Sequence, residues 1–144
     1  MGKPIKKVAI VGGSQSRKYA PFDDPTWDIW AFSNRRLPIP RVTRWYEIHA
    51  VQSLRRLRRT PSRRDFKEHW SLLRRQKCPV YMQRTHKDIP NSVAYPLDEA
   101  IAEFGRCFTS SASYAVAMAI IEGYQCIGLW GVDFTIRKHY GEQL

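Results

Sequence analysis

Two stretches of the chain are apolar without alternation: Val8–Val11, in a strand predicted over Lys6–Val11, and Cys126–Gly131. A strand that lacks a polar face is typical of a parallel sheet covered on both sides. Trp27–Phe32 alternates between polar and apolar residues and is rich in aromatic side chains, which also favours a strand. Val42–Ile48 and Pro79–Met82 complete the predicted strands.

The segment Ser110–Phe134 is the most informative. It begins with hydroxyl residues, continues as a helix that is apolar nearly all round and ends near Gly123, and finishes in a buried strand. A helix that is apolar on every side has to lie between two apolar layers. We expect Ser110 or Ser111 to cap this helix.

The other predicted helices are shorter. Apolar residues at mostly helical spacing over Leu54–Leu73 predict two basic helices, interrupted by a Thr-Pro-Ser turn in which Thr60 or Ser62 caps the second helix. A further helix is expected over Asp98–Phe104, after a loop at His86–Ser92.

These elements predict an α/β fold. We expect a single Rossmann-like domain over residues 1–144, with a mainly parallel sheet, helices on both faces and a basic helical insertion at about residues 50–77. A chain of 144 residues is long enough for one core and close to the lower limit for a doubly wound sheet of five or six strands.

Charge is concentrated in the predicted insertion. The formal net charge is +11, and Arg55–Lys77 holds ten basic residues against Asp65 and Glu68, a net +8. This surface is predicted to bind a polyanion, either nucleic acid or an acidic protein. The alternatives are a solvated basic face, or pairing with Asp23, Asp24 and Asp28. The candidate polyanion-binding residues are Arg55, Arg56, Arg58, Arg59, Arg63 and Arg64.

Composition narrows the class further. No apolar run approaches the length of a membrane span, and the N-terminus lacks the apolar core of a signal peptide. Cys78, Cys107 and Cys126 have no metal-ligand spacing, so we expect buried free thiols in a reducing cytoplasm, without a metal site. The oligomeric state stays open.

Polar and small residues follow almost every predicted strand. Because the carboxyl ends of parallel strands meet at one edge of the sheet, these residues are expected to line one ligand pocket there. Gly-rich turns and helix starts suit phosphate groups. The candidate ligand-binding residues are Gly12, Gly13, Ser14, Ser16, Asn34, Ser110, Ser111 and Asp133.

Each of these assignments has a structural alternative. Gly12–Ser16 matches neither the dinucleotide fingerprint nor the P-loop pattern, so it also suits a tight turn without a ligand. Capping explains one serine at Ser110–Ser111, and Asp133 also suits a turn. His49, two residues after Glu47, is the candidate catalytic general base or else a structural histidine.

The same segments resemble a known family. Ser110–Phe134 resembles the segment of bacterial CMP-sialic acid sialyltransferases that joins a hydroxyl-rich helix start, an apolar helix, Gly-Tyr and a strand ending in Gly-Ile-Asp-Phe. Val11–Ser16 resembles that family's phosphate loop, and Trp30–Asn34 its strand ending in asparagine. The resemblance implies a Rossmann-like domain that holds a cytidine nucleotide, with Asn34 at the phosphate and Ser110 and Ser111 near the nucleotide.

The chain also departs from that family. Gly13 stands where the family has an asparagine, and the family's catalytic histidine lies well beyond the matching segment, where this chain has only His139. We therefore expect the family's lid and last strands to be missing. Similar patterns occur in a domain found with archaeal hydroxymethylpterin pyrophosphokinases. The phrases Arg44–His49, Pro79–Gln83 and Ile89–Val93 resemble small proteins of tailed bacteriophages.

Three functions follow as expectations. The first is a phage protein of the host cytoplasm that binds a nucleotide or nucleotide sugar at the carboxyl edge of its sheet, either as a glycosyltransferase-like or as a nucleotidyltransferase-like enzyme. The second is a non-enzymatic protein that uses the basic segment on nucleic acid or an acidic partner. The third is a protein that sequesters a signalling nucleotide without turnover. No resident cofactor is implied.

Overall fold

A computed structural model describes residues 2–32 and 36–132 of the chain. Its centre is a six-stranded sheet in the order β5-β4-β3-β2-β1-β6, in which every neighbouring pair is parallel. The strands are β1 Lys7–Val11, β2 Trp27–Ala31, β3 Arg44–Glu47, β4 Val80–Met82, β5 Ser92–Ala94 and β6 Cys126–Trp130. The predicted α/β class with a parallel sheet is confirmed.

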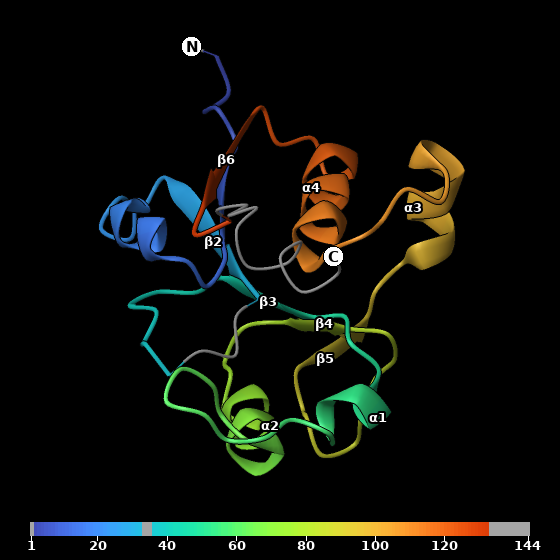
Figure 1. The fold of residues 1–144 in the computed structure, drawn as a ribbon. Helices are drawn as coiled ribbons and strands as arrows, with labels where there is room; N and C mark the ends of the chain where they lie inside the picture. Colours follow the sequence, from blue (N-terminus) through green and yellow to red (C-terminus); the bar gives the residue numbers. More distant parts are fainter. Residues whose placement is uncertain (1, 33–35, 133–144) are drawn as a thin grey trace, which may run out of the picture.

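Helices cover both faces of this sheet, as Figure 1 shows. On one face lie α3 and α4, and on the other lie α1, α2 and a short 3-10 helix, η1. The helical elements are η1 Gln15–Tyr19, α1 Val51–Leu54, α2 Phe66–Arg74, α3 Leu97–Phe104 and α4 Ser111–Ile121. No helix among residues 2–32 and 36–132 is long and apolar enough to cross a membrane.

Small side chains let α4 lie close to the sheet. Ala115 and Ala119 are fully buried against Val8, Ile10 and the aromatic residues of β2 and β3. The apolar residues of α4 thus cover the sheet. Because alanine side chains are small, they exclude water and still let the helix and the sheet pack closely. On its outer side Ile120 remains 49% exposed.

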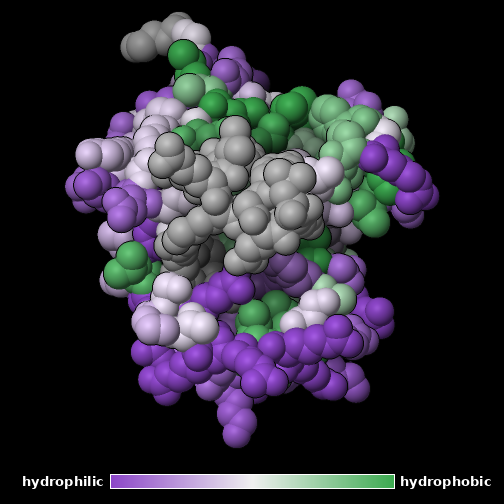
Figure 2. Space-filling model, in the orientation of Figure 1, coloured by the Kyte–Doolittle hydropathy of each residue, from purple (hydrophilic) through white to green (hydrophobic). Residues whose placement is uncertain are grey.

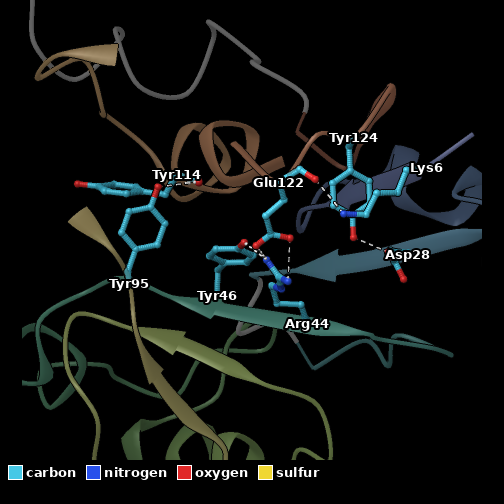
Figure 3. Close-up of polar contacts among 8 residues, drawn as sticks. All are labelled: Lys6, Asp28, Arg44, Tyr46, Tyr95, Tyr114, Glu122 and Tyr124. Atoms are coloured by element: carbon cyan, nitrogen blue, oxygen red, sulfur yellow. Dashed lines mark hydrogen bonds and ion pairs between the residues drawn. The ribbon is translucent and has the colours of Figure 1, made fainter. Parts of the chain in front are cut away.

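A polar cluster fastens α4 to the amino edge of the sheet (Figure 3). The guanidinium of Arg44 donates to both oxygens of the Glu122 carboxylate at 2.7 and 3.1 Å, and also to the hydroxyl of Tyr46 at 3.3 Å. Nearby, the Tyr124 hydroxyl donates to Asp28. Burial opposes the charge of Arg44, but its partners outweigh that effect and raise the pKa of the guanidinium. This edge is therefore occupied by structural contacts.

Several local predictions are wrong. Asp65, and neither Thr60 nor Ser62, caps α2: its carboxylate accepts from the backbone N–H of Glu68 at 2.9 Å. Thr60 instead pairs with Arg63 in a tight turn.

The loop predicted at His86–Ser92 ends in an edge strand, β5. This strand was not predicted because its three residues have only a weak strand pattern. The cysteines are free but not buried, since Cys107 is exposed and Cys78 and Cys126 are only partly covered.

Candidate functional site

The carboxyl ends of β3 and β4 open into two adjoining clefts that share His49 and Gln83. The first, about 350 Å³, is rich in hydroxyl groups and is here called the serine cleft; it is lined by Ile48, His49, Ala50, Ser53, Gln83, Phe108, Thr109, Ser110, Ser111 and Tyr114. The second, about 230 Å³, is here called the arginine cleft; it is lined by His49, Val51, Gln52, Arg55, Met82, Gln83, Arg84 and His86. His49 thus lies between an uncharged polar cleft and a cationic one.

A buried carboxylate determines how His49 is oriented. Glu47, the last residue of β3, is only 3% exposed and faces α2. One of its oxygens accepts from Nδ1 of His49 at 2.7 Å and from the backbone N–H of the same residue at 3.2 Å. The other oxygen lies 2.5 Å from Nε2 of His69, which is fully buried on α2. Both oxygens of a buried charge are therefore satisfied.

The electrostatics of the pair favour a charged contact. Burial raises the pKa of the Glu47 carboxyl, but the hydrogen bonds from His49 and His69 outweigh burial and hold this pKa below its ordinary value. The hydrogen bond to Glu47 raises the pKa of His49, against a smaller effect of burial. The His49 side chain is 63% exposed and lines both clefts, and Nε2 is the ring nitrogen that Glu47 does not contact.

The contacts of His69 also fix its tautomer. Its Nδ1 is buried and has no hydrogen-bond partner in the described part of the chain. A buried N–H without an acceptor is costly, so we assign the proton to Nε2, which donates it to Glu47. Glu47 then accepts from both histidines, and the Nδ1 of His49 carries a proton. The remaining nitrogen, Nε2 of His49, is left to accept or donate a proton.

The start of α4 forms the opposite wall of the serine cleft. Ser110 caps the helix in a capping box with Ser113, so one of the two predicted serines has a structural role. Ser111 takes no part in that capping box, and both Ser111 and Thr109 line the cleft. The amino end of an 11-residue helix also favours an anion in front of it.

The Gly12–Ser16 loop lies elsewhere and is bonded to the end of β6. Gly12 N–H donates to the Trp130 carbonyl at 2.8 Å, and Ser14 N–H donates to the Gly131 carbonyl at 2.9 Å. The Ser16 hydroxyl accepts from Gly131 N–H at 2.9 Å. These residues line neither of the two clefts, so the structure does not bring them together with Ser110 and Ser111 there.

The two glycines of that contact have a packing reason. A Cβ atom on Gly12 would lie 2.3 Å from the Gly131 carbonyl oxygen, and Gly131 has a φ of +69°. The crevice between β1 and β6, where the strand order reverses, is therefore filled by backbone at this level. A ligand role for Gly12, Gly13, Ser14 and Ser16 stays a prediction. Asn34 and Asp133 lie outside the described residues.

The basic segment forms an exposed surface next to the arginine cleft. Nine of its ten cations are exposed and Arg64 is half-buried; we call these ten residues, from Arg55 to Lys77, the basic surface. Figure 2 shows hydrophilic residues gathered over the lower part of the molecule, where Figure 1 places α1 and α2. Arg55 belongs to both the basic surface and the arginine cleft.

Among the described residues, the ion pairs of the exposed cations of the basic surface involve two carboxylates. Arg59 lies 3.3 Å from Glu68, which also pairs with Arg36, and Arg74 lies 3.7 Å from Asp88. Two of the three aspartates considered as partners are engaged elsewhere: Asp24 accepts from Thr26, and Asp28 accepts from Tyr124.

Sequence reasoning missed part of this site. Gln83 and Arg84 directly follow the predicted strand that became β4, so the rule applied to the other strand ends would also have found them. The contact of Glu47 with His69 joins residues 22 positions apart. Its only sequence signal is that His69 precedes Trp70 on the apolar face of α2.

Comparison of the chain with protein-family models, with curated proteins and with solved structures gives no match. Function is therefore argued from the site alone.

Proposed function

We propose that the protein binds a nucleotide or nucleotide-derived small molecule at the carboxyl edge of its sheet, in the two clefts beside His49. The observation that carries this proposal is the position of His49: buried Glu47 holds its Nδ1, and the residue lines a cleft rich in hydroxyl groups on one side and a cleft with arginines on the other.

The lining suits the two halves of a nucleotide. Arg55 and Arg84 supply fixed positive charge and forked donors for phosphate oxygens. Ser53, Thr109 and Ser111 supply hydroxyl groups for a ribose or a base. The tyrosine ring of Tyr114, stacked on Phe108 at 4.9 Å, adds an apolar wall to the serine cleft.

The catalytic form of the proposal is a group transfer. Nε2 of His49 removes the proton from a hydroxyl group of the second substrate. The oxygen of that hydroxyl group attacks the phosphorus or the anomeric carbon of the bound molecule. The bond to the leaving phosphate breaks, and that group departs with the electron pair. Glu47 stabilises the imidazolium that forms. This is glycosyl or nucleotidyl transfer with a histidine base.

The experiment is a thermal-shift screen against nucleotides and nucleotide sugars. A ligand at about 100 times its Kd stabilises the protein by about 2.7 kcal/mol, or about 6–10 °C for a domain of this size. We expect Arg84→Gln to abolish the shift and the exposed control Arg106→Gln to keep it. An unshifted wild-type protein over the whole panel would refute the proposal.

Sequestration without turnover is the second candidate function for the same site. It is favoured by the shape of the two clefts, which are open to solvent on their outer side. Binding without product, measured over hours at saturating nucleotide, would select this second function over transfer.

A further inference from the structure

The two clefts hold fewer charges than their surroundings do. The arginine cleft itself contains Arg55 and Arg84, enough for one or two phosphate groups. The adjoining basic surface exposes nine cations, and within the described part of the chain two of these nine form ion pairs, Arg59 with Glu68 and Arg74 with Asp88. A mononucleotide in the clefts would leave most of these cations without a contact to the ligand. The surface therefore suits a larger anionic ligand.

The basic surface is close enough to the proposed catalytic histidine, His49, to interact with it electrostatically. Arg55 lies on both, and the positive charge of Arg63 acts against the protonated form of His49. The other charged groups facing His49 are Glu47, and Arg84 of the shared cleft. A ligand in the clefts is therefore also within the field of the basic surface.

Composition of the basic surface separates nucleic acid from an acidic protein. Eight of its ten cations are arginines, whose forked donors match phosphate oxygens. Protein interfaces rely on exposed aromatic or aliphatic anchors, and the large exposed apolar residues among the described positions all lie outside Arg55–Lys77. This combination favours a phosphate chain.

The aromatic residues of the segment point to backbone contacts. Trp70 is 9% exposed, donates its indole N–H to Asp88 and packs against Phe66 at 5.3 Å. Neither ring forms an open platform on which bases stack. Binding through phosphates alone does not depend on sequence.

We propose that the ligand of the site is the end of a single-stranded nucleic acid, with its terminal nucleotide in the clefts beside His49 and the next phosphates on the basic surface. A cleft of 230 or 350 Å³ has room for one nucleotide and excludes a duplex, and a strand end places one nucleotide there while the rest of the strand continues along the basic surface. This inference rests on the proposed function and names its substrate class.

The experiment measures fluorescence anisotropy with labelled 12-residue strands of oligo-dT and oligo-U at 50–200 mM salt. If about five phosphates are neutralised, affinity falls about 100-fold over this range, since single strands lose about 0.7 log units per phosphate for each log unit of salt. Unlabelled circular dT12, duplex DNA, mononucleotide and poly-glutamate serve as competitors. We expect an unlabelled linear strand to compete at least 10-fold better than each of these. Comparison of the affinities for oligo-dT and oligo-U shows whether the protein prefers DNA or RNA.

A charge-matched pair of variants tests the surface. The first removes Arg56, Arg58, Arg59 and Arg63, each as Arg→Gln, and keeps Arg55 and Arg84. The control removes the same charge from exposed positions elsewhere: Lys3→Gln, Lys18→Gln, Lys87→Gln and Arg106→Gln. We expect the first variant to lose more than 10-fold in strand affinity with unchanged mononucleotide binding, and the control to bind both ligands normally.

The outcomes are distinguishable. If mononucleotide binds but the linear strand binds no tighter, this inference fails and the proposed function stands. If the circle, the duplex or poly-glutamate competes as well as the linear strand, the inference fails as well. If neither mononucleotide nor strand binds, both fail. The salt dependence of the wild-type protein decides the case even if the first variant does not fold.

Discussion

At the scale of single residues, the functional argument depends on one buried carboxylate. Glu47 lies between an exposed and a buried histidine and accepts a hydrogen bond from each. Removal of one partner from a buried charged contact is more costly than the contact itself is favourable. Substitutions here therefore report on the orientation of His49, on its pKa and on stability separately.

The first prediction concerns Glu47→Gln. Loss of the carboxylate removes the main cause of the raised pKa of His49, so this pKa is expected to fall toward its ordinary value. NMR titration of the His49 ring protons measures it directly. The exposed control Glu103→Gln leaves the titration unchanged, and an unaltered pKa of His49 in Glu47→Gln would contradict the assignment.

The same contact predicts a pH dependence of stability. Glu47 has a lowered pKa when folded, so its contribution is lost as the pH falls through that value. His49 has a raised pKa when folded, so its contribution is lost as the pH rises through that value. Urea unfolding at a series of pH values is expected to show the contribution of the pair, wild type minus Glu47→Gln, at its largest between these two limits. A flat difference would be inconsistent with the contact.

His69 provides a second test, as a positioning residue. His69→Leu leaves one oxygen of buried Glu47 without a donor and is expected to cost about 3 kcal/mol. His69→Gln keeps a donor and is expected to recover part of this loss. The 15N shifts of His49 report its tautomer and so separate positioning from stability. We expect His69→Gln to keep the Nδ1-protonated form of His49 and His69→Leu to change the shifts. If His69 were purely structural, the shifts would be the same in both variants.

At the scale of elements, the ends of β1 and β6 are locked together by Gly12 and Gly131. A methyl group on Gly12 meets the Gly131 carbonyl at 2.3 Å, and the backbone cannot yield without breaking the bonds to Trp130 and Gly131. Gly12→Ala is expected to destabilise the fold by about 1–3 kcal/mol, measured by urea unfolding. Gly2→Ala, where the new methyl meets nothing within 4 Å, is the control. Equal stability of both variants would show that the two strand ends do not meet as described.

These elements also show what sequence could predict. Unbroken apolar runs identify β1 and β6 because a strand buried on both faces has no polar positions. Three-residue β5 has no such run, and its existence depends on the backbone groups that β4 presents. The cap of α2 at Asp65 was missed because several polar residues precede that helix and only the local turn selects one of them.

At the scale of the whole molecule, the predicted parallel sheet indicated which edge would hold the candidate site, but not which strands would lie beside it. Polar residues after the strands were expected to meet at the carboxyl edge, and His49, Ser110 and Ser111 do meet in one cleft. The Gly12–Ser16 loop was also expected there, but it lines neither cleft, and the N–H groups of Gly12 and Ser14 donate to carbonyls at the end of β6. Sequence shows which residues end a strand, whereas the partners of their backbone groups depend on tertiary packing.

The most direct test of the central claim, a nucleotide site at the ends of β3 and β4, is an NMR titration of 15N-labelled protein with each ribonucleoside 5′-monophosphate. The account predicts saturable shifts at His49, Gln83 and Ser111, with no comparable shifts at Gly12–Ser16. Shifts centred on Gly12–Ser16, or no saturable shift with any nucleotide, would contradict it.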